Sequence, residues 1–316
     1  MLFSSAVSFL ATFAGFAAMP SPQAKAGTET FVSLIQNGRT VGVAALISDK
    51  GKFIAHRSAF VGSEVDARIR AGTIIRLKVA GEDRVTRLIC LDAGSALVGS
   101  WTSLLPPVDG GSVELQAVGP RGISNVQMVD DSRFGILGDN LRLVPLCEVR
   151  LEESEGALVN SLFVRGTEFR GVLVSSLSIS DQPPAATFSA LSQNFQAYGP
   201  GALQISFITG PKLVRRAMNA FLAGESVVRH PFLGIVCRNA LAGGAEIVTV
   251  SKNSPGQKAG LRVGDVLVEI EGKAIRRQLD FARTMMEQEI GDRIRLVVNR
   301  AGRQVRIDAV VGGSTD

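Results

Sequence analysis

The sequence predicts a mainly β protein built from two consecutive domains. Its 316 residues are too many for one ordinary core and suit two. Many short Val, Ile and Leu runs are separated by turn residues, and the chain holds 34 glycines but only one Trp and one Tyr. This pattern favours strands over a helical bundle. The pattern changes near residue 228, which predicts a domain boundary there.

The N-terminal stretch resembles an export signal. Residues 1–24 carry no charged side chain, residues 1–19 are largely apolar, and the small-residue motif AKA at 24–26 provides a cleavage site. We therefore expect a signal peptide over residues 1–26 and a periplasmic or secreted protein. The usual basic segment is missing, so an uncleaved membrane anchor through residues 2–19 remains an open alternative.

The first domain is expected over residues 28–225 and consists of short strands. Asn37-Gly38 is a strong hairpin signal between its first two strands. Strands are predicted at 31–35, 41–47, 53–55, 74–79, 85–91, 112–118, 124–129, 141–144, 161–164, 171–175 and 203–208. This spacing is typical of a barrel or sandwich. A helix closes the region, with apolar residues at helical spacing over 213–222.

The second domain, residues 229–316, alternates strands with two helices. Ser254 is a predicted N-cap with Pro255 at the first helical position, and Gly260 ends that short helix. A longer helix is predicted over 276–288. The segments 294–298 and 305–311 alternate apolar and polar residues, which indicates two half-buried antiparallel strands.

Composition excludes several functional classes. The chain has 34 Lys and Arg against 29 Asp and Glu, but the basic residues are scattered, which indicates a mixed solvated surface and no nucleic-acid partner. Cys90, Cys147 and Cys237 are too few and too far apart for a zinc site, and His56 and His230 are the only histidines. We expect no metal and no cofactor, because no cofactor motif is present either.

The C-terminal half carries a specific resemblance. The strings SPGQKAGLRVGDVL at 254–267 and RAGR at 300–303 resemble the PDZ domains of the HtrA serine protease family, and the resemblance covers residues 230–312. The string PFLGI at 231–235 is similar to the loop and strand that, in the family, present backbone N–H groups to the terminal carboxylate of a peptide. The resemblance therefore implies that this domain binds peptide or protein C-termini.

The peptide-binding residues expected from this resemblance are Phe232, Leu233, Gly234, Ile235, Phe281 and Met285. Consecutive amides converge on an anion while the peptide adds a strand beside Ile235, and a Cβ at Gly234 would obstruct that approach. Phe281 and Met285 lie one turn apart on the longer helix and can line a side-chain pocket. The alternative is that these side chains fill the domain core and that the groove is closed or vestigial.

The N-terminal half is similar to the protease domain of the same family. The strand QISFI at 204–208 and the helix after it resemble the end of that domain, VGPRGIS at 118–124 is similar to its Gly-x-Pro-x-Gly loop, and GVAALISDKGKFI at 42–54 is similar to its early hairpin. The resemblance runs from end to end. It implies a trypsin-like double β-barrel followed by an α+β PDZ domain.

The catalytic positions of the family are degenerate in this chain. The histidine of the family comes four residues beyond the hairpin string, where this chain has Ser58. When an earlier family aspartate is matched to Asp92, the catalytic aspartate position falls on Ala96. The nucleophile motif GNSGGAL corresponds to EESEGAL at 152–158, so the serine survives as Ser154.

These replacements predict a loss of catalysis. A serine needs a positioned base to take its proton, and Ser154 has none in the expected place. Glu152 replaces a glycine of the oxyanion hole, and Glu153 and Glu155 add two more carboxylates beside a developing negative charge. We therefore predict a pseudoenzyme of the serine endopeptidase class.

The expected function is binding. The chain would act as an adaptor, regulator or chaperone-like factor in envelope protein quality control, with misfolded exported proteins or an active HtrA relative as partners. The family forms trimers through its protease domains, which implies a homo-oligomer. The alternative is an active serine endopeptidase that uses Ser154 and a rearranged base, His56, oriented by Asp49 or Asp92.

Overall fold

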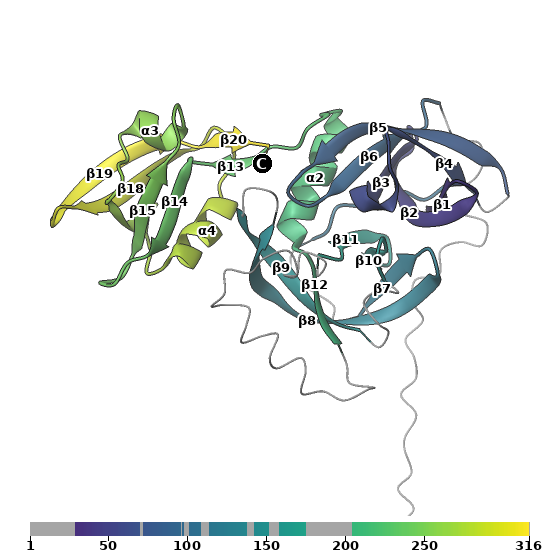
Figure 1. The fold of residues 1–316 in the computed structure, drawn as a ribbon, viewed down its shortest axis with the longest axis horizontal. Coiled ribbons are helices and arrows are strands. Elements are labelled where there is room, and N and C mark those ends of the chain that lie inside the picture. The colour runs from purple at the N-terminus through teal and green to yellow at the C-terminus, as the bar shows by residue number, and fades with distance from the viewer. Residues whose placement is uncertain are drawn as a thin grey trace, which may run out of the picture.

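The computed structural model describes residues 29–69, 72–95, 97, 101–108, 114–137, 142–151, 158–174 and 204–315. The predicted mainly β fold is confirmed, with two barrel-like sheets followed by a smaller α+β domain (Figure 1). The expected signal peptide or anchor lies outside the described residues. Within the described part of the chain, no helix is long and apolar enough to cross a bilayer.

Six strands close the first barrel. They are β1 (Phe31–Gln36), β2 (Arg39–Ser48), β3 (Lys52–His56), β4 (Glu64–Arg68), β5 (Ile74–Asp83) and β6 (Leu88–Asp92), and a 3-10 turn, η1 (Arg57–Ala59), follows β3. Asn37 and Gly38 have φ angles of 54° and 73° at the β1–β2 turn, so the predicted hairpin is confirmed. The short charged strand β4 was not predicted, yet it closes the barrel by pairing with β1.

The second sheet has the strand order β11-β10-β7-β8-β9-β12. Its strands are β7 (Glu114–Gly119), β8 (Gly122–Leu137), β9 (Arg142–Leu151), β10 (Leu162–Arg165), β11 (Glu168–Val172) and β12 (Gln204–Thr209). A bridge between Leu173 and Ile208, together with a 2.8 Å hydrogen bond from the Val174 amide to the Phe207 carbonyl, joins the two edges of this sheet. The sheet therefore curls into a second barrel.

The predicted closing helix is confirmed as α2 (Pro211–Ala223). Its buried face, which includes Val214, Met218 and Phe221, belongs to a core cluster shared with both barrels. Gly224 ends the helix in the left-handed region, at φ 86°, and its amide bonds back to the last turn. The helix thus fastens the two barrels to each other.

The C-terminal domain is an antiparallel sheet with two helices. Its sheet has the order β14-β15-β16-β18-β19, formed by β14 (Ile235–Asn239), β15 (Ala245–Val250), β16 (Val266–Ile270), β18 (Arg293–Arg300) and β19 (Arg303–Val310), with β17 (Lys273–Ala274) beside β16. The helices are α3 (Pro255–Ala259) and α4 (Gln278–Met286), and β13 (His230–Phe232) pairs with β20 (Gly312–Ser314). Ser254 and Gly260 cap α3 as predicted.

Buried contacts attach this domain to the barrels. His230, at the junction between the domains, is fully buried, and its Nε2 lies 2.9 Å from Oδ1 of the equally buried Asp83. Met286 of α4 packs in a cluster with Val85 and Leu213 from the barrel side. The position of α4 is consequently fixed from both domains.

Candidate functional site

Ser58 occupies a polar cluster at the end of β3. His56 ends that strand, and its Nδ1 lies 2.6 Å from Oγ of Ser58 and 3.3 Å from the Ser58 amide nitrogen. The Ser58 hydroxyl donates to Oδ1 of Asn160 at 2.7 Å. Nδ1 of His56 is therefore engaged by Ser58 whichever ring nitrogen carries the proton.

The imidazole of His56 is a weak base in this setting. Burial, and then the positive charge of Arg87, lower the pKa of His56 from its ordinary 6.5 to about 4, although a hydrogen bond with Asn160 acts in the opposite direction. The ring is consequently neutral near pH 7. A general base works best with a pKa near the operating pH, so this environment opposes proton abstraction by His56.

Asn160 ties this cluster across the two barrels. It lies in the turn before β10 with φ 64°, a left-handed conformation that asparagine tolerates better than most residues. Its Nδ2 donates to the Val41 carbonyl of β2 at 3.2 Å while its Oδ1 accepts from Ser58. Two segments of the first barrel are thus joined to the second barrel through one side chain.

The acids proposed to orient His56 are not bonded to its Nδ1. Asp92 lies opposite Lys52 in the β3–β6 pair, whereas His56 lies opposite Leu88. The four-residue separation corresponds to about 13 Å along a strand. Asp49 accepts a hydrogen bond from the neighbouring Ser48 hydroxyl, at 3.3 Å. Neither carboxylate takes the place that an orienting acid needs.

The other positions at which the sequence predicts a degenerate site lie outside the described residues. These are Ala96, Ser154 and the glutamates Glu152, Glu153 and Glu155. Among the described residues, no group of three or more His, Cys, Asp or Glu side chains could hold a metal ion.

All three cysteines are buried. Burial raises the pKa of Cys90 to about 11 and that of Cys147 and of Cys237 to about 12. At neutral pH the three thiols stay protonated and are therefore poor nucleophiles.

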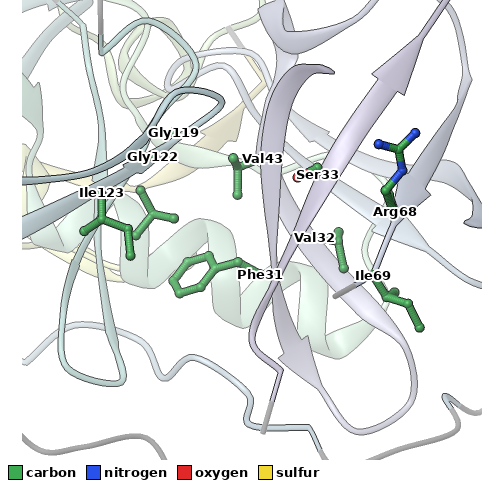
Figure 2. Close-up of a pocket in the computed structure, with 10 residues that line it drawn as sticks. Phe31, Val32, Ser33, Val43, Arg68, Ile69, Gly119, Gly122 and Ile123 are labelled. Carbon is green, nitrogen blue, oxygen red and sulfur yellow. The ribbon is translucent and has the colours of Figure 1, made fainter. Parts of the chain in front are cut away.

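A cleft of about 380 Å³ separates the first barrel from the β7–β8 hairpin. Figure 2 shows Phe31 and Val43 on the first barrel and Ile123 on the hairpin, with Ser33 and Arg68 further along β1 and β4. Its lining is mainly apolar and includes neither His56 nor Ser58.

A second candidate site runs along β14. This strand lies at the edge of its sheet and pairs only with β15, and α4 also contacts it. Such an edge offers unpaired backbone groups to an added strand. Within the described residues, the Leu233 and Gly234 amides, directly before β14, donate to no acceptor. The start of β14 therefore presents free donors to an anion.

Gly234 shapes this loop for two reasons. Its φ of 73° is in the region that favours glycine, and a Cβ added there would come within 2.2 Å of the Ser254 Cβ. The Gly234 carbonyl accepts from the Ser251 amide at 2.8 Å, and the Leu233 carbonyl accepts from Gly256 at 2.7 Å. The two carbonyls are thereby bonded within the domain, whereas the two amides have no acceptor among the described residues.

The side chains predicted for peptide binding divide into two groups. Leu233 and Met285 are 2% and 5% exposed and belong to the domain core. Ile235 and Phe281 pack against that core but remain partly exposed, so they are accessible beside the edge of β14, and Phe232 is also half-buried. Leu233 and Met285 therefore fill the domain core, as the alternative interpretation expects. Ile235, Phe281 and Phe232 remain accessible for contact with a bound peptide.

Sequence reasoning missed residues whose partners are distant along the chain. Asn160 bonds to Ser58 across 102 positions, and nothing near it marks that role. Asn239, whose Oδ1 accepts from the Gln278 amide at 2.9 Å, joins the end of β14 to the start of α4. Its place directly before the hairpin turn was the one available signal.

Comparisons with known proteins agree with this geometry. Residues 246–300 match the family model described as a PDZ domain. A serine protease Do-like HtrA from Lactobacillus helveticus is 22% identical over 281 residues, which cover 84% of this chain and 66% of that protein. The magnetosome formation protease MamE of Magnetospirillum gryphiswaldense is 30% identical over 148 residues, which cover 43% of this chain and 18% of that protein. The chain spans less than two thirds of the length of both relatives.

A solved structure extends the likeness over most of the chain. The HtrA-type protease AlgW with a decapeptide matches with a TM-score of 0.61 and 18% identity, covering 87% of this chain and 83% of the other. At this identity the match establishes the fold. This chain therefore has the HtrA-type trypsin-like serine protease fold, a double barrel followed by a PDZ domain.

Proposed function

We propose that this protein is a catalytically inactive HtrA-like chain that binds peptide or protein C-termini through its PDZ domain. It would work as an adaptor, regulator or chaperone-like factor for exported proteins in the periplasm or outside the cell. Its partners would be misfolded exported proteins or an active protease of the same fold.

The observation that carries the proposal is the polar cluster around Ser58. The position that the sequence resemblance matches to the family's catalytic histidine is Ser58, whose hydroxyl donates to Asn160. The nearby imidazole of His56 has a pKa of about 4 and is engaged through Nδ1. A serine nucleophile gains little from a base of that strength.

The peptide-binding half of the proposal rests on β14. An edge strand, the free Leu233 and Gly234 amides, and the accessible Ile235 and Phe281 side chains together fit an extended peptide with a terminal carboxylate. The amides would bind the carboxylate, and the edge of β14 would pair with the peptide backbone.

Activity-based labelling tests the loss of catalysis. The full chain and its Ser154→Ala variant are incubated with a fluorophosphonate probe, beside a competent trypsin-like protease as positive control. We expect no label on either form of the chain. Labelling of the native chain that disappears in Ser154→Ala would instead establish an active endopeptidase with a rearranged base.

Peptide titration tests the binding half separately. A library of peptides with free C-terminal carboxylates is compared with the same peptides as C-terminal amides, and the amides should bind at least about tenfold more weakly. Gly234→Ala should abolish binding, because its Cβ meets Ser254. The matched control is Gly302→Ala, which has a similar φ of 80° but nothing within 4 Å of its added Cβ. Equal affinity for acids and amides would contradict this model of the groove.

A further inference from the structure

The β14–β15 hairpin ends in an exposed apolar tip. Leu241 is 109% exposed, the highest value among the large apolar side chains of the described residues. The exposed Ala242 follows it, and a turn closed by the Gly243 amide on the Ala240 carbonyl holds both residues outward. A leucine that is fully hydrated at a hairpin tip is free to enter an apolar environment, and its transfer out of water is favourable.

Two arginines lie beside this tip. The Gly244 amide donates to the Arg276 carbonyl at 2.9 Å, so the segment that leads into α4 runs against the base of the hairpin. Arg277 follows, and both arginines are exposed. Within the described residues, neither guanidinium has an ion-pair partner. This end of the domain therefore presents an exposed leucine, Leu241, beside two arginines without ion-pair partners among the described residues, Arg276 and Arg277.

The acidic groups nearby are already engaged. Asp280 accepts from the backbone amides of Arg276 and Arg277, at 3.0 Å each. Glu246 is paired with Arg238 at 2.9 Å. Neither carboxylate forms an ion pair with Arg276 or Arg277, so both guanidinium groups can approach an external anion.

We propose that this hairpin tip is a docking site for an anionic phospholipid bilayer. Leu241 enters the boundary between headgroups and acyl chains while Arg276 and Arg277 lie among the phosphates, an arrangement in which apolar burial and charge attraction add. This role is independent of peptide binding, because the free amides of Leu233 and Gly234 lie at the opposite end of β14.

The contacts predict weak and salt-sensitive binding. Each arginine near an anionic surface strengthens binding roughly fivefold, and a buried leucine adds roughly tenfold. Screening should remove most of the arginine contribution in about 1 M salt, where charges interact over roughly 3 Å.

The chain offers a matched control position. Val263 is also an exposed apolar residue, at 65%, in the loop before β16, and Arg262 precedes it. Arg262 lies close enough to Asp265 to help lower the pKa of that carboxyl. Its charge is therefore partly compensated, and the loop bonds to Ile247 in β15, away from the hairpin tip.

Local quenching tests the proposal in the full chain. Leu241→Trp and Val263→Trp are made separately in a Trp101→Phe background, so each protein has one tryptophan. Each is mixed with vesicles of brominated phosphatidylglycerol and phosphatidylcholine. The reporter is local, so retention or removal of residues 1–26 does not affect its reading.

We expect the tryptophan at 241 to lose emission and shift to the blue with phosphatidylglycerol vesicles, and the tryptophan at 263 to stay unchanged. Changing Arg276 and Arg277 to Gln together should weaken this response roughly 25-fold. No quenching at 241, equal quenching at both positions, or quenching at 241 that persists on pure phosphatidylcholine would overturn the proposal. Docking on a protein partner would give the first of these results.

Discussion

Acidification should destabilise the first barrel through His56. Its pKa is lowered to about 4 in the folded chain by burial and by Arg87, whereas an unfolded chain keeps the ordinary 6.5. Between these values the unfolded chain binds a proton that the folded chain does not bind. The folded state is therefore favoured fully above about pH 6.5 and loses this contribution as the pH falls toward 4.

The size of the loss follows from the two pKa values. Their difference corresponds to a loss of about 3 kcal/mol of unfolding free energy once the pH is well below 4, and of about 2.5 kcal/mol near pH 4.5. His56→Asn lacks the imidazole and should lack this part of the pH dependence. Chemical denaturation followed by the emission of Trp101, which packs on Phe53 of the first barrel, measures both proteins at several pH values.

Two results would refute this reasoning. One is a pH profile of unfolding free energy that runs parallel in the native chain and His56→Asn. The other is an NMR titration of the His56 ring with a midpoint above pH 6, which is simple to assign because the chain has two histidines. Either result would mean that the ring is solvated and that it remains available as a base.

Three further changes test contacts described above. Asn160→Gly keeps the left-handed turn but removes the bonds to Ser58 and Val41, so unfolding free energy should fall by about 1–2 kcal/mol in chemical denaturation; an unchanged value would mean that the cluster does not join the barrels. His230→Ala should cost about 2 kcal/mol by leaving buried Asp83 without its imidazole partner, and limited proteolysis should cut more readily before β13; equal cleavage of both proteins would contradict this. Arg300→Ala removes two hydrogen bonds to the Asp265 carboxylate, which is 1% exposed, so the unfolding free energy of the PDZ domain should fall by about 2 kcal/mol and its Tm should drop. An unchanged Tm in calorimetry would contradict this.

Local signals in the sequence predicted local structure well. Asn37-Gly38 indicated a hairpin because few residue pairs take two positive φ values, and both occur. Ser254 and Gly260 bounded α3 because they satisfy the backbone groups that a helix leaves unpaired at its ends. The edge strand at Ile235 was likewise predicted, from its resemblance to a family loop.

Pairing between distant segments was not predictable in the same way. Strand β8 runs through Asp130 and Arg133, where apolar alternation stops, because register shifts let it continue along β9. The bond between His230 and Asp83 joins positions 147 residues apart, and that between Ser58 and Asn160 joins positions 102 apart. Such contacts follow from how the barrels close, for which no single stretch of sequence carries a signal.

In the proposed binding mode, the direction of β14 determines how a bound peptide would leave the PDZ domain. With its terminal carboxylate at the Gly234 amide, the peptide would run antiparallel to β14 and reach the hairpin after about five residues, or roughly 17 Å. It would then emerge beside Leu241. A membrane protein bound at the same lipid surface as the hairpin could therefore reach the Leu233 and Gly234 amides with an extended C-terminal tail. A protein whose last residues are folded against its own surface would not have enough free chain to reach them.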